Sequence, residues 1–399
     1  MKPKTVMLVA GEASGDTIGA QLVQALRGEL TRAEVEYTAD LQPLHTGLEP
    51  RFFGAGGPRM AAAGVDLAFD LTKHSITGFP TPKDYLVGRR HFNQLLELAI
   101  HQQPDVIVGI DYNYFNLRFA EAIRSHASHR SGWFQDWRPK IVKYISPQLW
   151  ASREGRAFQI ARDYDLVLSI FPFEKAWYAK RAPKLQVEFV GHPMFDRLTR
   201  SNAKPNDSTI LLLPGSREGE LKLHLPVILK ALKLIRENVP NAKAKMIATN
   251  EELAELARAL GVDCEIQIGN LPQALASSHI AIASTGTVTM ECALFGLPTV
   301  TLYKKHLLGV ALRIGLIKSK WFSMPNILAK EEVFPEFIQN AATPENISKA
   351  ALELMHNESR RKAIQAKLAE IVSTLGGPGA SNRAARAIAK LLEPRMHTK

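Results

Sequence analysis

The sequence predicts an α/β protein with two doubly wound domains, each built on a parallel sheet. Short runs of β-branched and aliphatic residues alternate with segments of helical period, as at 5–12 and 105–111 in the first half and at 209–216 and 280–284 in the second. Continuous apolar strands separated by helices are typical of a parallel sheet that is covered on both faces. The alternation stops at a polar segment and then starts again, which indicates two sheets rather than one.

The length of 399 residues also favours two domains, since one domain usually holds roughly 100–200 residues. The segment RLTRSNAKPNDST is polar and follows neither period, so we place a linker at 199–208. The expected parts are a first domain at 1–198, a second domain at 209–345 and a helical segment at 346–399. The sequence GGPGAS interrupts this last segment. Whether the helix after this break packs back on the first domain is left open.

Composition limits the classes of protein that the chain can belong to. Hydrophobic residues make up 46% and charged residues 22%, as in ordinary globular proteins. The apolar run before Gly11 is shorter than the roughly 7–15 residues of a signal-peptide core, and no run approaches the roughly 18 of a membrane span, so we expect a cytoplasmic protein. Cys264 and Cys292 lack metal-ligand spacing and are expected to be buried thiols, with no metal site.

The net charge of +11 favours an anionic partner, which could be nucleic acid, a phosphorylated substrate or an acidic membrane surface. Basic residues are spread along the chain, and we find no nucleic-acid-binding module. Nucleic acid is therefore not the expected partner.

Strand-to-helix turns are the places to look for a site, because open parallel sheets bind ligands beyond the carboxyl ends of their strands. The first turn contains Ser14 and Gly15, with Asp16 as a candidate cap of the following helix. It matches neither the dinucleotide nor the Walker pattern. A second cluster contains Gly56 and Gly57. Each glycine turn could admit a ligand close to the backbone or could simply be a tight turn ahead of a helix.

Asp111 follows a strongly apolar strand and is the candidate general base. A carboxylate at the rim of a sheet can accept a proton from an attacking hydroxyl that lies within hydrogen-bond reach. The competing interpretation is that Asp111 caps the next turn. Its position at the strand end favours the functional role.

The turn after 209–213 carries Gly215 and Ser216, whose backbone N–H groups lie at the positive end of a predicted helix, and then Arg217. An arginine is an always-ionised fork that suits phosphate oxygens. This combination indicates a site for a diphosphate, although an isolated arginine is more often a solvated surface charge.

A second such turn contains Ser284, Thr285, Gly286 and Thr287, again at a predicted helix start. Glu291 lies one helical turn further on the same face, where it could accept hydrogen bonds from ribose hydroxyls. The alternative is that Glu291 only complements the helix dipole. Two anion-binding turns without a Walker lysine favour a nucleotide-sugar diphosphate over a triphosphate.

Motifs along nearly the whole chain resemble one family. They are AGEASGD, GAGGPRM, SPQLWA, VGHPMFD, LPGSR, STGTVTMECAL, MPNILA and PEFIQ, in that order. Together they are similar to the lipid-A-disaccharide synthases, glycosyltransferases of the GT-B type. The resemblance implies two Rossmann-like domains that face across a cleft.

The resemblance also implies a reaction without a metal ion or cofactor. A diacylated glucosamine would pass from UDP-2,3-diacylglucosamine to the 6-hydroxyl of 2,3-diacylglucosamine 1-phosphate, forming a β-1,6-linked disaccharide and releasing UDP. Asp111 would activate the hydroxyl, and Arg217 with the helix-start amides would stabilise the leaving UDP.

Carried over position by position, Glu291 would bind the ribose, and Asn326 and Gln339 would line the UDP pocket. His192 would lie near the cleft between the domains. The competing readings are a turn residue for Asn326, a surface amide for Gln339 and a structural histidine for His192. The residues expected on the acceptor side of the cleft are Ser14, Gly15, Gly56, Gly57 and His192.

The chain departs from the family in the acceptor half. Tyr114 replaces a second acidic residue, Ser152 replaces an aromatic residue, and the segment 73–86 is less apolar than its family counterpart. The apolar residues that remain and could still enter a bilayer, among basic groups, are Ile76, Phe79, Tyr85 and Leu86. The acylated substrates and the positive charge lead us to expect peripheral association with the inner face of the cytoplasmic membrane. The oligomeric state is left open.

Two other functions stay under consideration. An isomerase similar to UDP-N-acetylglucosamine epimerase would share two Rossmann-like halves and a UDP site but would need no acylated acceptor. A non-catalytic UDP-sugar-binding protein would bind UDP without turnover.

Overall fold

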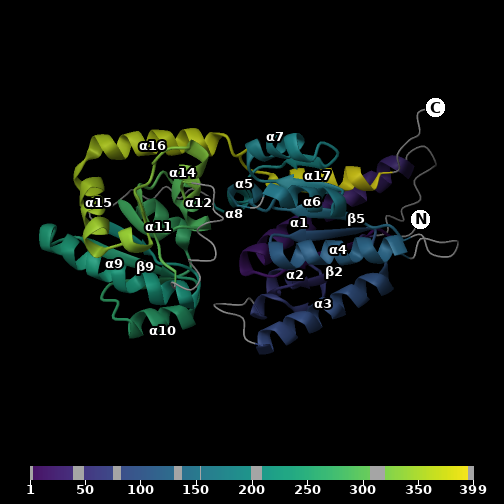
Figure 1. Cartoon of the computed structure of the whole chain (residues 1–399), viewed down its shortest axis with the longest axis horizontal. Helices are drawn as coiled ribbons and strands as arrows, with labels where there is room; N and C mark the ends of the chain where they lie inside the picture. The colour runs from purple at the N-terminus through teal and green to yellow at the C-terminus, as the bar shows by residue number, and fades with distance from the viewer. Residues whose placement is uncertain are drawn as a thin grey trace. The chain divides into compact units, whose positions relative to one another are not determined.

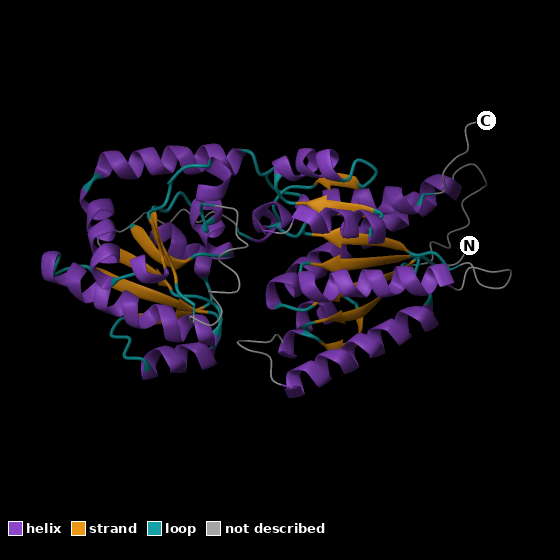
Figure 2. Ribbon diagram, in the orientation of Figure 1, coloured by secondary structure: helices purple, strands orange, loops and turns teal. Residues whose placement is uncertain are grey.

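The computed structural model describes residues 3–38, 49–74, 82–129, 137–152, 154–198, 209–305 and 320–393. The chain divides into two compact units (Figures 1 and 2), Met1–Asp196 with Leu375–Lys399, and Arg197–Thr374. Each unit has its own parallel sheet with helices on both faces, so the predicted fold class is confirmed.

The sheet of the first unit has seven parallel strands in the order β3-β2-β1-β4-β5-β6-β7. The order runs outward from β1 in one direction and from β4 in the other. The strands are β1 Thr5–Ala10, β2 Arg51–Gly56, β3 Asp66–Asp70, β4 Val106–Ile110, β5 Lys140–Tyr144, β6 Leu166–Ser169 and β7 Gln186–Phe189. The α-helices that belong to this unit or end at its border are α1 Ala13–Thr38, α2 Pro58–Ala62, α3 Pro82–Gln102, α4 Asn113–His129, α5 Leu149–Ser152, α6 Ala157–Asp163, α7 Pro172–Arg181, α8 Met194–Arg197 and α17 Ala380–Leu392.

This sheet has a hydrophobic core on each face. Successive side chains of a strand point to opposite faces, so each strand contributes to both cores. Leu8 and Val108 belong to a core on one face that includes residues of α1 and α17. Met7 and Ile107 belong to the core on the other face, formed with α4, α6 and α7. The inner strands β1 and β4 are therefore largely apolar, and Asp111 follows directly where β4 ends.

The sheet of the second unit has six parallel strands in the order β10-β9-β8-β11-β12-β13. The strands are β8 Thr209–Leu213, β9 Lys243–Ala248, β10 Glu265–Ile268, β11 Ile280–Ser284, β12 Thr299–Tyr303 and β13 Glu336–Ile338. The α-helices are α9 Glu218–Asn238, α10 Glu251–Ala259, α11 Leu271–Ser277, α12 Thr287–Leu294, α14 Met324–Ala329, α15 Pro344–His356 and α16 Glu358–Ser373.

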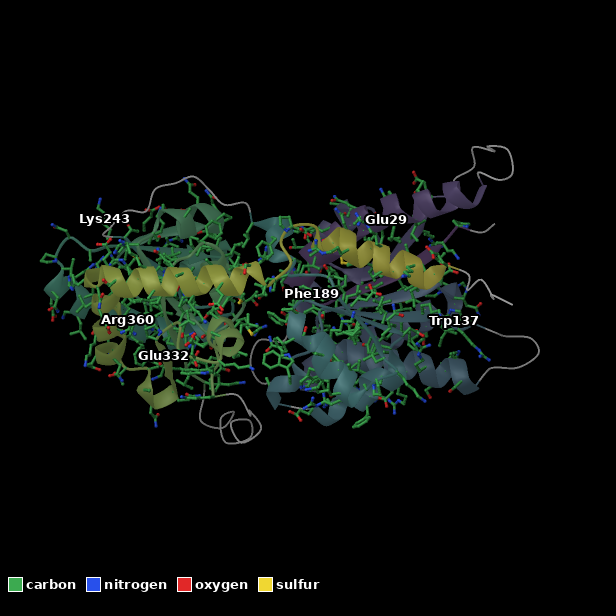
Figure 3. The ribbon with its side chains drawn as sticks, turned by 90° about the horizontal axis from the view of Figure 1, so that it is seen from above. Glu29, Trp137, Phe189, Lys243, Glu332 and Arg360 are labelled. Atoms are coloured by element: carbon green, nitrogen blue, oxygen red, sulfur yellow. The ribbon has the colours of Figure 1, made fainter. Side chains whose placement is uncertain are left out.

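The C-terminal helices belong to different units. Helices α15 and α16 lie in the second unit, where α15 packs on α9, whereas α17 packs along α1 of the first unit. Figure 3 shows α17 in yellow beside the purple α1, where Glu29 is labelled. The division between the two units in this part of the chain falls at Leu375, within the helical segment 346–399. The linker expected at 199–208 lies outside the described residues.

Asp196 anchors α17. Its carboxylate accepts hydrogen bonds from the backbone N–H groups of Gly379, Ala380 and Ser381 at 2.5, 3.3 and 2.8 Å. A carboxylate at a helix N-terminus satisfies donors that have no partner within the helix and interacts favourably with the helix dipole. The last residue of the motif VGHPMFD thus ties the C-terminal helix to the end of the first unit.

We predict that Asp196→Ala lowers the free energy of unfolding of the first unit by about 1–2 kcal/mol, because the N-terminal amides of α17 lose their acceptor. Urea denaturation of the full chain followed by circular dichroism measures this. The matched control is Glu29→Gln on α1, which breaks the pair of Glu29 with the exposed Arg386 of α17 at 3.4 Å and should change stability by less than about 1 kcal/mol. An Asp196→Ala protein that unfolds like the wild type would contradict the anchoring role.

Candidate active site

The predicted turns lie beside the switch point of each sheet. In the first unit the strand order reverses between β1 and β4, so the Ser14–Gly15 turn and Asp111 lie at the carboxyl ends of the two strands that flank the reversal. In the second unit it reverses between β8 and β11, which are followed by Gly215–Arg217 and Thr285–Thr287. Such reversals open a crevice at which α/β proteins bind ligands.

Asp16 does not cap its own helix, which differs from the prediction. Helix α1 begins at Ala13, and the Asp16 side chain is almost completely buried. Its carboxylate accepts hydrogen bonds from the N–H groups of Gly57 at 2.8 Å, Arg59 at 3.0 Å and Met60 at 2.9 Å. Asp16 therefore caps α2, and it joins the first glycine turn to the second.

Close packing accounts for the second glycine cluster. A Cβ atom at Gly57 would lie 2.7 Å from an oxygen of the Asp16 carboxylate, and one at Gly56 would collide with the sulfur of Met60. At Gly15 an added Cβ would make only ordinary contacts, the nearest at 3.4 Å from Cβ of Ala10. The structure thus favours the tight-turn interpretation for Gly56 and Gly57, whereas Ser14 and Gly15 lie in the first turn of α1, where Gly15 is buried.

The backbone is strained where β4 and β5 end. Asp111 and Tyr112 have φ of +43° and +42°, and Ile145 has φ of +66°. This left-handed region is uncommon for residues with a side chain, especially a β-branched one, and such residues cluster at functional sites. The half-buried Asp111 carboxylate accepts a long hydrogen bond, 3.5 Å, from the Asn113 amide.

Lys143 of β5 is fully buried behind this turn, and sequence reasoning missed it. Its ammonium donates a hydrogen bond to the backbone carbonyl of Asp111. Burial lowers the pKa of Lys143 to about 8, and the nearby negative charge of Asp111 opposes that shift. The sequence does contain a signal for this buried lysine. Lys143 lies two residues after Ile141 and so on the same face of the strand, where an apolar side chain is expected.

Glu174 is a second buried charge at this edge. It accepts hydrogen bonds from Trp150 Nε1 at 3.2 Å and from the Phe171 N–H at 3.3 Å, and burial raises its pKa to about 7. His192 lies nearby, with its ring centre 5.9 Å from that of Phe171. Its Nδ1 accepts a hydrogen bond from the Met194 N–H at 3.2 Å, and its side chain is almost fully buried, so it braces the turn before α8.

We predict that Glu174 makes stability fall with rising pH. Its folded pKa of about 7 lies above the ordinary value of 4.5, so between these values the folded state keeps a proton that the unfolded state has released. The stabilisation is complete below pH 4.5 and is lost as the pH rises through about 7. Relative to Glu174→Gln, the wild type should lose about 2–3 kcal/mol of unfolding free energy between pH 5 and pH 8. Urea denaturation at both pH values tests this, and parallel pH curves for the two proteins would refute it.

In the second unit, Glu220 occupies the turn after β8. Its carboxylate accepts a hydrogen bond from the Ser216 N–H at 3.2 Å and lies 3.6 Å from the half-exposed guanidinium of Arg217. Gly215 has φ of +135°, and a Cβ there would lie 2.6 Å from the same carboxylate. The predicted anion-binding turn therefore already holds a negative group, which shows that its donors point to a common place.

His224 fixes this turn from behind. The imidazole is fully buried, with Nδ1 at 2.7 Å from the carbonyl oxygen of Pro214 and Nε2 accepting the N–H of Lys304 at 3.0 Å. With a proton on Nδ1, the ring donates to the Pro214 carbonyl and accepts from the Lys304 N–H. His224 thus links the turn after β8 to the end of β12, and the sequence alone gave no sign of this link.

The second anion-binding turn begins at the end of β11. Ser284 is buried, whereas Gly286 and Thr287 are exposed at the start of α12. The first amides of a helix have no acceptor within the helix, so they are available to a ligand. The Thr285 N–H donates to the Leu302 carbonyl at 3.0 Å, and Thr289 Oγ1 donates to the Gly286 carbonyl at 2.7 Å, which holds the turn in place.

Glu291 is paired inside the protein. Its side chain is almost fully buried and accepts a hydrogen bond from Arg197, the first residue of the second unit. Burial raises the pKa of Glu291, and the Arg197 charge opposes this. The prediction from sequence placed only a ribose against Glu291 and did not foresee the arginine.

Asn326 and Gln339 also make internal contacts. The Asn326 amide donates to the Phe334 carbonyl at 2.9 Å and accepts the N–H groups of Val333 and Phe334 at 2.9 and 2.8 Å. Gln339 follows β13 with φ of +53°, and its Oε1 accepts the Lys305 N–H at 3.2 Å. Asn326 is fully buried, so its side chain holds a loop, while Gln339 is half-buried at the strand end.

Solved structures with the same fold include enzymes that act on nucleotide sugars and glycosyltransferases. A putative UDP-N-acetylglucosamine 2-epimerase from Listeria monocytogenes superposes with a TM-score of 0.57 at 15% identity, over 98% of this chain and 97% of that one. CalG4, the calicheamicin glycosyltransferase, superposes with a TM-score of 0.58 at 15% identity over the full length of both chains. The fold is therefore that of the GT-B glycosyltransferases and related epimerases.

Sequence comparison distinguishes between the epimerases and the glycosyltransferases. The model of the lipid-A-disaccharide synthetase family matches residues 6–391. The lipid-A-disaccharide synthase of Syntrophus aciditrophicus is 34% identical over 96% of this chain and 97% of its own length, and that of Chromohalobacter salexigens is 34% identical over 97% of each. The chain belongs to the lipid-A-disaccharide synthetase family, and it is a glycosyltransferase.

Proposed function

We propose that this transferase condenses UDP-2,3-diacylglucosamine with 2,3-diacylglucosamine 1-phosphate, forming the β-1,6-linked lipid A disaccharide 1-phosphate and UDP. The observation that supports it most is that Asp111 lies at the switch point of one sheet and two amide-rich turns lie at that of the other, in a member of this family. In this proposal the residues 1–198 bind the lipid acceptor and 209–345 bind the UDP-sugar.

On the acceptor side, Asp111 is the general base. Its carboxylate takes the proton of the acceptor 6-hydroxyl while the hydroxyl oxygen bonds to the anomeric carbon of the donor, and the bond from that carbon to the diphosphate oxygen breaks. The anomeric configuration inverts in this single displacement. Proton transfer by a positioned carboxylate typically contributes a factor of 10² to 10⁴ to the rate. The Ser14–Gly15 turn, at the other side of the same switch point, would receive the acceptor sugar.

On the donor side, positive groups stabilise the UDP that leaves. Arg217 and the amides of Gly215, Ser216, Gly286 and Thr287 would surround the diphosphate, since donors that are already oriented lose little free energy on reorganisation. The Glu220 carboxylate, which now accepts the Ser216 amide, would yield this place to a phosphate oxygen.

The nucleoside would bind beyond the same turns. Glu291, oriented by Arg197, would accept a ribose hydroxyl with its remaining acceptor capacity. Gln339 would face the nucleotide from the end of β13. Asn326 would act through the loop at Val333–Phe334 that it holds. His192 would support the acceptor side by keeping the turn before α8 in place.

We predict that UDP release by the purified protein in detergent micelles requires both glycolipids, because the hydroxyl of the acceptor is the nucleophile. Asp111→Asn should lower kcat by about 10²- to 10⁴-fold. The matched control is Asp66→Asn, at an exposed aspartate of the same unit that pairs with Arg51, and it should be as active as the wild type.

Two results would contradict this function. UDP release without an acceptor, together with a free epimer of the amino sugar, would support an isomerase. A putative UDP-N-acetylglucosamine 2-epimerase shares this fold. Binding of UDP without any product would support a binding protein.

We also propose that the first unit contacts the cytoplasmic face of the inner membrane. Four exposed large apolar residues, Leu86, Tyr114, Phe158 and Phe173, lie in the first turns of α3, α4, α6 and α7. In a parallel sheet a helix that directly follows a strand begins at the carboxyl edge, so Tyr114 of α4 and Phe173 of α7 lie at the same rim as Asp111. Leu86 and Phe158 are placed on this rim as part of the proposal. Among the described residues, no helix is both long and apolar enough to cross a bilayer.

Basic residues accompany this apolar rim. Arg89, Arg90, Arg118 and Lys175 are exposed on the same helices. Apolar side chains that insert into the interface and cations that attract anionic lipids together give reversible membrane binding. The diacylated substrates would enter from the same surface. Ile76 and Phe79, which the sequence also suggested for this contact, lie outside the described residues.

We predict that binding to vesicles containing anionic lipid weakens in high salt but is not abolished, because salt screens only the charge contribution. A double variant, Phe158→Ser with Phe173→Ser, should lose the fraction that resists salt in a vesicle sedimentation assay. The control Ile268→Ser changes an equally exposed apolar residue of the second unit and should bind as the wild type does. Complete release by salt, or equal loss in the control, would refute the proposed rim.

A further inference from the structure

A lysine occupies a core position of the interior strand β5. Lys143 is fully buried and is paired in register with Gly109 of β4 and Val167 of β6. Its strand neighbours Ile141 and Val142 are apolar core residues. A buried ammonium is costly to desolvate, and replacing a buried charge with an apolar residue of similar volume is often neutral or stabilising. The stability of the fold therefore does not explain Lys143.

The contacts of Lys143 lead to the strained turn. Its ammonium donates to the carbonyl oxygen of Asp111, and the Asn116 amide donates to the same oxygen at 2.9 Å. The Asn116 amide also lies 3.3 Å from the carbonyl oxygens of Val9 and Ile110, so it connects β1 with β4 at the switch point. Two donors that converge on one carbonyl fix the orientation of the peptide that follows Asp111.

That peptide decides where the Asp111 carboxylate points. Asp111 and Tyr112 both have left-handed backbone angles, which a chain keeps only when its surroundings enforce them. Lys143 also places a positive charge close to the Asp111 side chain. Lys143 itself lies too deep in the core to touch a substrate.

We propose that Lys143 is the positioning residue of the candidate base: its buried ammonium holds the carbonyl of Asp111 and thereby maintains the left-handed turn that presents the carboxylate. This inference rests on the proposed role of Asp111. Lys143 would then affect the reaction although its side chain does not contact the substrate.

The test replaces Lys143 with methionine, which keeps an unbranched stem of similar length and removes the donor and the charge. In the acceptor-dependent UDP release assay, Lys143→Met should lower kcat by about 10- to 100-fold, because misplaced catalytic groups lose rate even when binding is intact. The KM for the UDP-sugar should change by less than about 2-fold, because that substrate is assigned to the second unit. The melting temperature should be equal to or higher than that of the wild type.

The matched control is Lys140→Met, the same substitution in the same strand at the opposite end, where the lysine is only half-buried. It should match the wild type in kcat. Hydrogen–deuterium exchange of a peptide covering 109–116 gives a readout that does not need activity. Exchange should become faster in Lys143→Met and stay unchanged in Lys140→Met.

The outcomes separate the two proposals. Unchanged kcat and unchanged exchange in Lys143→Met would overturn the positioning role. A lowered melting temperature with faster exchange throughout the first unit would also overturn it, because the lysine would then serve the fold as a whole. If the wild type shows no transferase activity but Lys143→Met still loosens only 109–116, the positioning of Asp111 stands and the proposed reaction fails.

Discussion

The structure depends on one constraint, which is that both faces of each parallel sheet are buried. The strands beside each switch point, β1 and β4 in one sheet and β8 and β11 in the other, are then largely apolar on both sides, and most polar groups lie where these strands end. Because all strands of a sheet run in the same direction, the turns that lead into helices meet at one edge. The candidate base and the two anion-binding turns are at these edges because the fold offers them no other place.

Turns at a sheet edge need support from behind, and buried polar groups supply it. Asp16 holds the start of α2, His224 joins two turns of the second unit, and Asn326 holds the loop at Val333–Phe334. In each case a buried side chain bonds to backbone groups of another segment, which satisfies donors and acceptors that would otherwise be lost to burial. Rigid turns of this kind keep catalytic groups in position before a substrate arrives.

The strand ends that carry the candidate residues could be predicted from the sequence, whereas the internal partners of these residues could not. Apolar runs that end in small or hydroxylated residues identify strand ends, so Asp111, Gly215–Arg217 and Ser284–Thr287 were found from local pattern alone. The pairing of Arg197 with Glu291 and the capping of α2 by Asp16 join residues that are far apart along the chain. Such contacts depend on the assembled backbone, and no spacing in the sequence reveals them.

Tyr114, which differs from the acidic residue of the family pattern, is not one of the groups that hold the candidate base Asp111. Tyr114 is exposed and lies against Arg118, whose guanidinium is 5.7 Å from the centre of its ring, one turn along α4. Asp111 is held by Lys143 and Asn116, which both contact its carbonyl from inside the sheet. Tyr114 takes no part in that support. An acidic residue at this exposed position would likewise lie outside the hydrogen bonds that hold Asp111, so its replacement by Tyr114 leaves that support unchanged.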